Sequence, residues 1–168
     1  AQIAAISTAG FSGLVAAQIR AFDATAQLPF IEPADIAVLP DFVIASITTS
    51  QIPNLTTAQV QTGLTTTNVG LLTSNQTAAL LTTQVAVLDS QDLARLSSTA
   101  LSGLSTAAVA LLTTAQLAAI GGTELPGIQS AAIAALNTAQ VVAISSANFS
   151  GLTSQQISAL TTVQVPVI

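Results

Sequence analysis

The chain has 168 residues, of which 51% are apolar and only 5% are charged, and its formal net charge is −5. Its two basic residues, Arg20 and Arg95, cannot form the positive surface that nucleic acid binding requires. Cys and His are absent, which excludes disulfides, zinc fingers and the Ser-His or Cys-His pairs of nucleophilic enzymes. We therefore expect a protein that is not an enzyme, holds no cofactor and binds no nucleic acid.

An apolar residue recurs every eight residues, and we number it position 1 of an octad. The position-1 residues are Ile6, Leu14, Phe22, Ile31, Leu39, Ile47, Leu55 and Leu64, and then every eighth residue from Leu72 to Ile168. One extra residue near 27–30 and another near 61–63 shift the phase. The pattern predicts a single continuous octapeptide-repeat solenoid over residues 1–168.

The octad has the form L-T-T-A-Q-V-A-A. Position 6 is apolar almost throughout, with Thr77 as the clear exception, and positions 7 and 8 are mostly small. Positions 2 to 5 form a helix capping box, in which a hydroxyl and a Gln side chain each accept from a backbone N–H. Thr56–Gln59, Thr113–Gln116 and Thr153–Gln156 are three instances, and Pro33 stands at a first helical position. Each octad therefore predicts one short capped helix.

A single long helix does not fit this pattern, because eight residues leave a drift of about 80° per repeat. The chain must bend once per octad. Position 6 and the following position 1 are three residues apart, so both face one side of the short helix. We predict an all-α solenoid with Leu, Ile and Val inside.

A β-solenoid is the alternative. Thr, Val and Ile favour strands, but Ala and Gln do not, and positions 1 and 6 cannot both point inward from one straight strand. Pro53, Pro126 and Pro166 at position 7, and Gly121-Gly122 at a cap, argue against full α-helices there. They therefore count in favour of the β-solenoid. The helical fold is still the prediction, with many turns that are single or 3₁₀-like.

The acidic residues are the only candidates for a metal site. Glu32 with Asp35, and Asp89 with Asp92, each occupy positions 2 and 5 of an octad. Paired carboxylates suit a hard cation such as calcium. The register instead favours acidic capping boxes at helix N-termini, so no metal is expected. Arg95 lies three residues after Asp92 and predicts a surface ion pair.

Apolar stretches are interrupted by Thr, Ser or Gln well before the ~18 residues of a membrane helix, so membrane insertion is not expected. The chain begins at Ala1, and neither end shows a polar capping repeat. We therefore expect a processed subunit or a fragment, whose ends meet other copies of the chain or the flanking repeats of a longer one.

The Leu-Thr-Thr-Ala-Gln-Val pattern resembles the tandem arrays of very large secreted proteobacterial surface proteins and adhesins. That resemblance covers the whole chain and implies an extracellular, elongated role. Residues 136–144 also look like the opening helix of a TAL-effector repeat, but the remainder of that longer repeat and its basic residues are missing.

These observations predict a structural repeat protein of a bacterial cell surface, either a spacer or a self-assembling filament subunit. The low charge favours lateral or end-to-end association of copies of the chain over solubility. The alternative is an ice- or glycan-binding module that uses regular Thr and Ser rows at octad positions 2 and 3.

Overall fold

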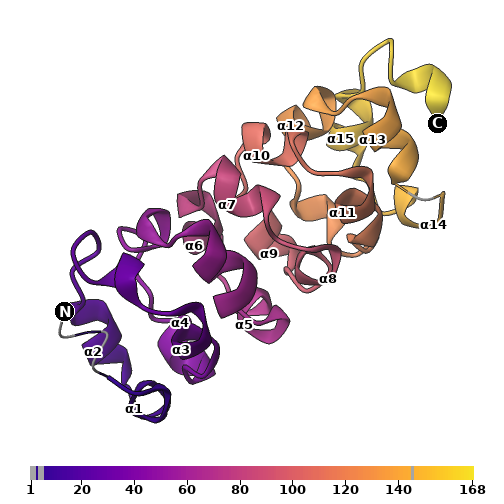
Figure 1. The fold of residues 1–168 in the computed structure, drawn as a ribbon. Coiled ribbons are helices and arrows are strands. Elements are labelled where there is room, and N and C mark those ends of the chain that lie inside the picture. Colours follow the sequence, from indigo (N-terminus) through magenta and orange to yellow (C-terminus); the bar gives the residue numbers. More distant parts are fainter. Residues whose placement is uncertain (1–2, 4–5, 145) are drawn as a thin grey trace.

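The chain is a succession of short helices joined by tight bends in a computed structural model that describes residue 3, residues 6–144 and residues 146–168 (Figure 1). The elements in chain order are α1 (Thr8–Ser12), α2 (Ala16–Ala21), η2 (Leu28–Phe30), α3 (Pro33–Ala37), α4 (Asp41–Ile44), η3 (Ile52–Asn54), η4 (Gln59–Gly63), α5 (Thr66–Gly70), α6 (Ser74–Ala79), α7 (Thr82–Ala86), α8 (Ser90–Leu93), α9 (Ser98–Leu101), α10 (Thr106–Ala110), α11 (Thr114–Ala119), η5 (Leu125–Gly127), α12 (Ser130–Ala135), α13 (Thr138–Ala143), α14 (Ser146–Phe149), α15 (Ser154–Ser158) and η6 (Val165–Val167). No strand occurs among the described residues, and the predicted all-α solenoid is confirmed.

The octad explains where each helix begins and ends. In α11, the N-cap Thr113 at position 2 has extended backbone angles, and its hydroxyl accepts from the N–H of Gln116. The helix fills positions 3 to 8 and stops at Ile120, the next position 1, where the backbone is again extended with φ −72° and ψ 122°. The bend between octads therefore lies at positions 1 and 2.

Proline shortens the helix to a 3₁₀ turn. Pro29, Pro53, Pro126 and Pro166 lie in η2, η3, η5 and η6, each a three-residue 3₁₀ turn. An α-helix would need the N–H that proline lacks, whereas these short turns do not. Pro53, Pro126 and Pro166, which favoured the β-solenoid in the sequence, thus lie in 3₁₀ turns of a helical fold.

Wider turns take up the two extra residues in the sequence. The N–H of Leu28 donates to the carbonyl of Asp23, five residues back. At the second site η4 is a π-helix, which also closes its hydrogen bonds over five residues.

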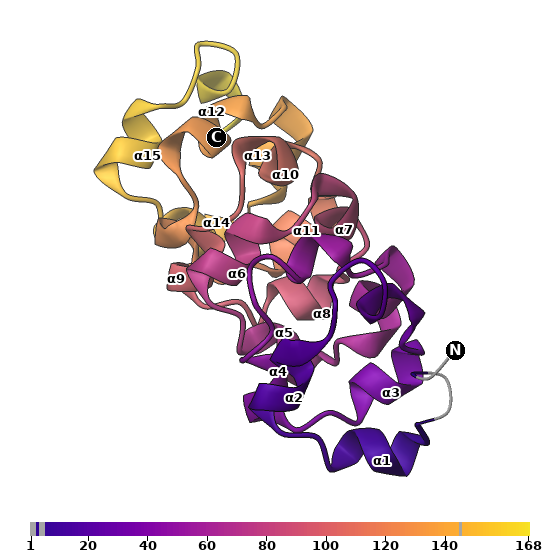
Figure 2. The same ribbon diagram turned by 90° about the vertical axis from the view of Figure 1, so that its left-hand side faces the viewer.

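Helices three octads apart pack on one another and form three columns, so that one coil of the solenoid contains about 24 residues. The first column contains α1, α3, η4, α7, α10, α12 and α15. The second contains α2, α4, α5, α8, α11, α13 and η6. The third contains η2, η3, α6, α9, η5 and α14. The termini lie at opposite ends of the array (Figures 1 and 2).

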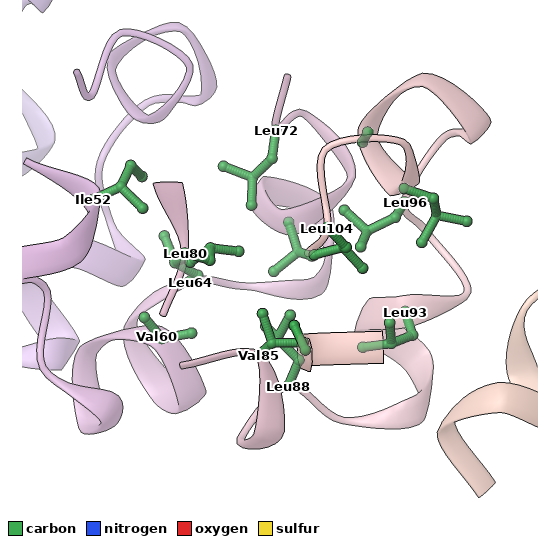
Figure 3. Close-up of a cluster of buried hydrophobic side chains, with 14 of the residues drawn as sticks. Ile52, Val60, Leu64, Leu72, Leu80, Val85, Leu88, Leu93, Leu96 and Leu104 are labelled. Atoms are coloured by element: carbon green, nitrogen blue, oxygen red, sulfur yellow. The ribbon is translucent and has the colours of Figure 1, made fainter. Parts of the chain in front are cut away.

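The core runs along the inside of the three columns. Position-1 and position-6 side chains fill it, as Figure 3 shows for Leu64, Leu72 and Val85. Position-6 residues such as Leu117 and Ile133 are fully buried. Burying each such side chain contributes about 1.5–3 kcal/mol. None of the described helices is long and apolar enough to cross a membrane.

Successive coils come very close together in the third column. A Cβ on Gly103, Gly127 or Gly151 would collide with the carbonyl oxygen of Ser74, Ser98 or Gly122 respectively, one coil earlier. The three glycines are 24 residues apart and occupy position 8 of their octads. Only a residue without a side chain allows this approach.

Candidate functional site: an amide ladder between coils

The predicted capping box is present, and it uses one half of each position-5 side chain. Oε1 of Gln116 accepts from the N–H of Thr113 at 2.7 Å, and the N–H of Gln116 donates to the Thr113 hydroxyl at 3.2 Å. The equivalent distances between Thr153 and Gln156 are 2.8 and 3.2 Å. The predicted box at Thr56 and Gln59 forms too.

The other half of the same carboxamide joins two coils. Nε2 of Gln116 donates to the carbonyl of Leu88 at 2.6 Å, 28 residues earlier. This acceptor is position 1 of the octad directly below in the same column. The same donation links Gln51 to Phe22, Gln59 to Ile31, Gln76 to Ile47, Gln84 to Leu55, Gln140 to Leu112, Asn148 to Ile120, Gln156 to Ile128 and Gln164 to Leu136. We call this set of bonds the amide ladder.

The ladder is buried, and its hydrogen bonds are satisfied. Its Gln side chains are only 1–5% exposed. Several donate twice; Gln156, for example, also reaches the carbonyl of Leu125 at 2.7 Å. Among the described residues no buried side-chain nitrogen or oxygen lacks a partner. Since an unsatisfied buried polar group costs about 1–3 kcal/mol, the ladder favours one register of coil on coil.

Three octads carry Ala at position 5, namely Ala100, Ala108 and Ala132, and cannot contribute a rung. At Ala100 the hydrogen bond between coils is made by a side chain of the preceding coil. Thr77, the exception at position 6, is 1% exposed, and its hydroxyl donates to the carbonyl of Ala100 at 2.6 Å. A core hydroxyl therefore bonds these two coils where position 5 carries no amide, but its acceptor is the carbonyl of Ala100 and not a position-1 carbonyl.

Asp89 and Asp92 form the acidic capping box that their register predicts. The Asp89 N–H donates to Asp92 at 3.1 Å, and the Asp92 N–H donates to Asp89 at 2.8 Å. Asp92 is 4% exposed, and burial raises the pKa of its carboxyl above its ordinary value despite the hydrogen bonds from Asp89 and Thr66. Asp92 thus stands on a rung of the ladder without an N–H₂ to donate.

The second acidic pair, Glu32 and Asp35, does not form the acidic capping box that its register predicts. Glu32 makes no side-chain cap bond in α3, which begins at Pro33, and Asp35 is buried. This pair lies in the first column, whereas Asp89 and Asp92 lie in the second, so the fold does not combine the four carboxylates. The described residues contain no group of three or more metal-ligating side chains.

The predicted ion pair between Arg95 and Asp92 is wrong. Asp92 points into the contact between coils, while Arg95 is exposed beside Thr67 and Gly70. No ion pair involving Arg95 occurs among the residues described.

Hydroxyls at position 2 serve as helix caps. Ser7, Thr65, Thr73, Ser97 and Ser105 each accept from the N–H three residues on. Capping therefore accounts for the hydroxyl row at position 2, and only the row at position 3 remains for ice or glycan binding.

The ladder was not among the features predicted from the sequence, although the sequence carries a signal for it. A capping box accepts Glu as well as Gln, yet Glu occurs at position 5 only once, at Glu124. A carboxylate cannot donate a hydrogen bond, so the preference for Gln indicates that its N–H₂ is also used. The 24-residue spacing of Gly103, Gly127 and Gly151 was a second signal, for three octads per coil.

No curated protein matches the sequence. The family model of the ALTTAQ repeat matches the chain twice, over residues 85–121 and 125–162. The first segment runs from within α7 to the end of α11, and the second from η5 past α15. The chain is a tandem-repeat protein, and in these two segments its repeats are similar to the ALTTAQ repeat.

Proposed function

We propose that this chain is an elongated structural element of a bacterial cell surface, a spacer or fibre subunit that acts through its length and not through catalysis. The amide ladder is the observation that carries the proposal. Each coil binds its neighbour through the same buried contacts, so the length of such a solenoid scales with the number of coils.

The composition supports an extracellular site. The chain contains no Cys to be oxidised, and its exposed residues are mostly uncharged, with many Thr, Ser and Ala among them. The octad also resembles the tandem arrays of large secreted surface proteins. Antibody labelling of intact, unpermeabilised source cells tests this location, and labelling only after permeabilisation would contradict it.

Small-angle X-ray scattering tests the spacer role. Duplicating residues 104–127 adds three octads, which is one coil. We expect the maximum dimension of the particle to grow while its cross-section stays constant. A particle that grows equally in all directions would contradict a spacer.

A further inference from the structure

One contact in the middle of the solenoid lacks the amide ladder. Residues 88–111 form one coil, and its three position-5 residues are Asp92, Ala100 and Ala108. None of the three has an amide to donate to the position-1 carbonyls of the coil below, which residues 64–87 form. We call the contact between residues 64–87 and residues 88–111 the joint.

Carboxamides bind the contacts on either side of the joint. In the coil below the joint, Gln76 and Gln84 donate to the coil before it, and Gln116 of the coil above donates back to Leu88. The stability of a solenoid is approximately a sum of the stabilities of its repeats and of the contacts between neighbours. The joint, which lacks these bonds, is therefore the weakest of these contacts.

Two hydroxyls and apolar packing hold the joint together. The Thr77 hydroxyl donates to the carbonyl of Ala100 at 2.6 Å, and the Thr66 side chain forms a hydrogen bond with Asp92. Val85 and Leu93 lie in the apolar core on the two sides of the joint (Figure 3). Apolar packing is not directional, so it fixes the register of one coil on the next less firmly than a buried hydrogen bond does.

The exposed side of the joint is open to solvent. A cleft of about 240 Å³ lies where α5 and α8 meet, and its walls are formed by Thr67, Gly70, Leu71, Ala94 and Arg95. Leu71 and Arg95 are both exposed in this cleft. Solvent therefore reaches the edge of the contact at a place where no amide bridges the two coils.

We propose that the joint is an opening point of the solenoid, at which the segment before Leu88 and the segment from Leu88 onward separate while each stays folded. The backbone hydrogen bonds of the described residues connect residues at most five apart, so the stacked faces of the two coils share none of them. Opening therefore costs side-chain contacts only, as in other local openings of native proteins. Under tension the solenoid lengthens at the joint before any helix unfolds. This inference concerns the mechanics of the fold and does not depend on the cellular location proposed above.

Thiol labelling of the whole chain tests the opening, because the chain contains no Cys and one introduced thiol reports on its own site. Val85→Cys and Val109→Cys place a thiol on the two sides of the joint, where each valine is 1% exposed. Val60→Cys is the matched control. Val60 is 0% exposed at the same octad position of the same column, between contacts that Gln59 and Gln84 bind. In native buffer we expect both thiols of the joint to react about tenfold faster than the control or more, because one or two missing hydrogen bonds shift an opening equilibrium by that factor.

Restoring a rung should close the joint. Ala108→Gln, added to Val109→Cys, offers an amide to the coil below, and we expect labelling to slow by about fivefold. Ala107→Gln is its control, because Ala107 is exposed on the same helix, and it leaves the rate unchanged. Asp92→Asn is a second restoring variant that preserves the shape of the side chain. Asn148 shows that Asn at position 5 reaches a position-1 carbonyl of the coil below, so Asp92→Asn slows labelling even where Ala108→Gln perturbs folding.

Equal labelling rates at the joint and at the control site would overturn the opening point, and so would fast labelling that neither restoring variant slows. The urea dependence of labelling tests whether the two segments stay folded. Opening one contact exposes little surface, so the rate at the joint should rise less steeply with urea than global unfolding does. An equally steep rise would show that reagent reaches these thiols only when the whole chain unfolds, which would also overturn the proposal. The spacer function is tested separately by scattering and stands or falls on that measurement.

Discussion

At the residue scale, Gln116 uses both ends of its carboxamide, with Oε1 accepting from Thr113 and Nε2 donating to Leu88. At neutral pH, where a carboxyl is ionised, a primary amide can accept and donate at these two places and a carboxylate cannot. Asp92 occupies the same octad position and can only accept when it is ionised. The contrast between these two residues yields two predictions of opposite sign.

Replacing Gln116 with Glu keeps the shape and the cap acceptor but directs a carboxylate at the carbonyl of Leu88. We expect the free energy of unfolding at neutral pH to fall by about 3 kcal/mol. The loss should shrink at acidic pH, where the protonated carboxyl donates again. The control is Gln155→Glu, because Gln155 is exposed and lies in another column. This substitution should change the free energy of unfolding in urea by less than about 0.5 kcal/mol. Equal effects of the two substitutions would contradict the ladder.

Replacing Asp92 with Asn restores a donor, and Asn68 and Asn148 show that position 5 accommodates Asn. The folded-state pKa of Asp92 is raised, so the folded chain favours the protonated form. The contribution of the Asp92 carboxyl to stability is therefore fully present below the ordinary carboxyl pKa, and it is lost as pH rises through the folded-state pKa of Asp92. At neutral pH we expect Asp92→Asn to be more stable by about 1 kcal/mol.

The difference in the free energy of unfolding between Asp92→Asn and the wild type reports the titration of Asp92 alone. The pKa of Asp23 is lowered by hydrogen bonds from Ala26 and Thr25, which makes stability fall at acidic pH, but Asp23 is present in both proteins. The advantage of the variant should vanish as pH falls toward 4. An advantage independent of pH would show that Asp92 does not titrate as its burial requires.

At the element scale, the sequence predicted the helices well because their causes are local. The Thr113 cap, the Gln116 return bond and the extended residue at Ile120 all lie within one octad or its boundary. Proline likewise acts on its own turn, as at Pro126. The contact between elements was not predictable in the same way, because it joins residues 28 apart and depends on the number of octads in a coil.

Gly127 tests the close approach between elements. A Cβ at this position would collide with the Ser98 carbonyl, so Gly127→Ala must push η5 and α9 apart. We expect a loss of about 1–3 kcal/mol or more in thermal unfolding. Gly13→Ala is the control, because its Cβ would lie 3.6 Å from the Gly10 carbonyl, an ordinary contact. A tolerated Gly127→Ala would contradict the packing in the third column.

At the scale of the whole molecule, the repeating unit is three octads. The octad is the unit of local structure, yet column identity returns only every 24 residues, as Gly103, Gly127 and Gly151 show. The octad is recognisable in the sequence, but the three-octad coil is not, because the octads of the three columns have nearly the same sequence pattern. The octads of different columns differ in sequence at the few positions where successive coils are in contact.

Deletions distinguish the two units. Removing residues 104–127 deletes one complete coil. Gly151 then occupies the place of Gly127 and packs against Ser98, as Gly127 does in the wild type. We expect a shorter solenoid with cooperative unfolding. Removing only residues 120–127 shifts every later octad to another column and puts Ala135 where glycine is needed. This smaller deletion should be the more damaging one in urea unfolding, and equal stability would show that the columns are interchangeable.

Buried carboxamides connect each coil to the one below, and hydrogen exchange of their side-chain N–H₂ groups gives the sharpest check of these bonds. NMR resolves these protons for each Gln. We expect slow exchange for Gln84, Gln116 and Gln140, and fast exchange for the exposed Gln61, Gln91 and Gln155. Uniformly fast exchange in the folded chain would mean that the ladder does not exist.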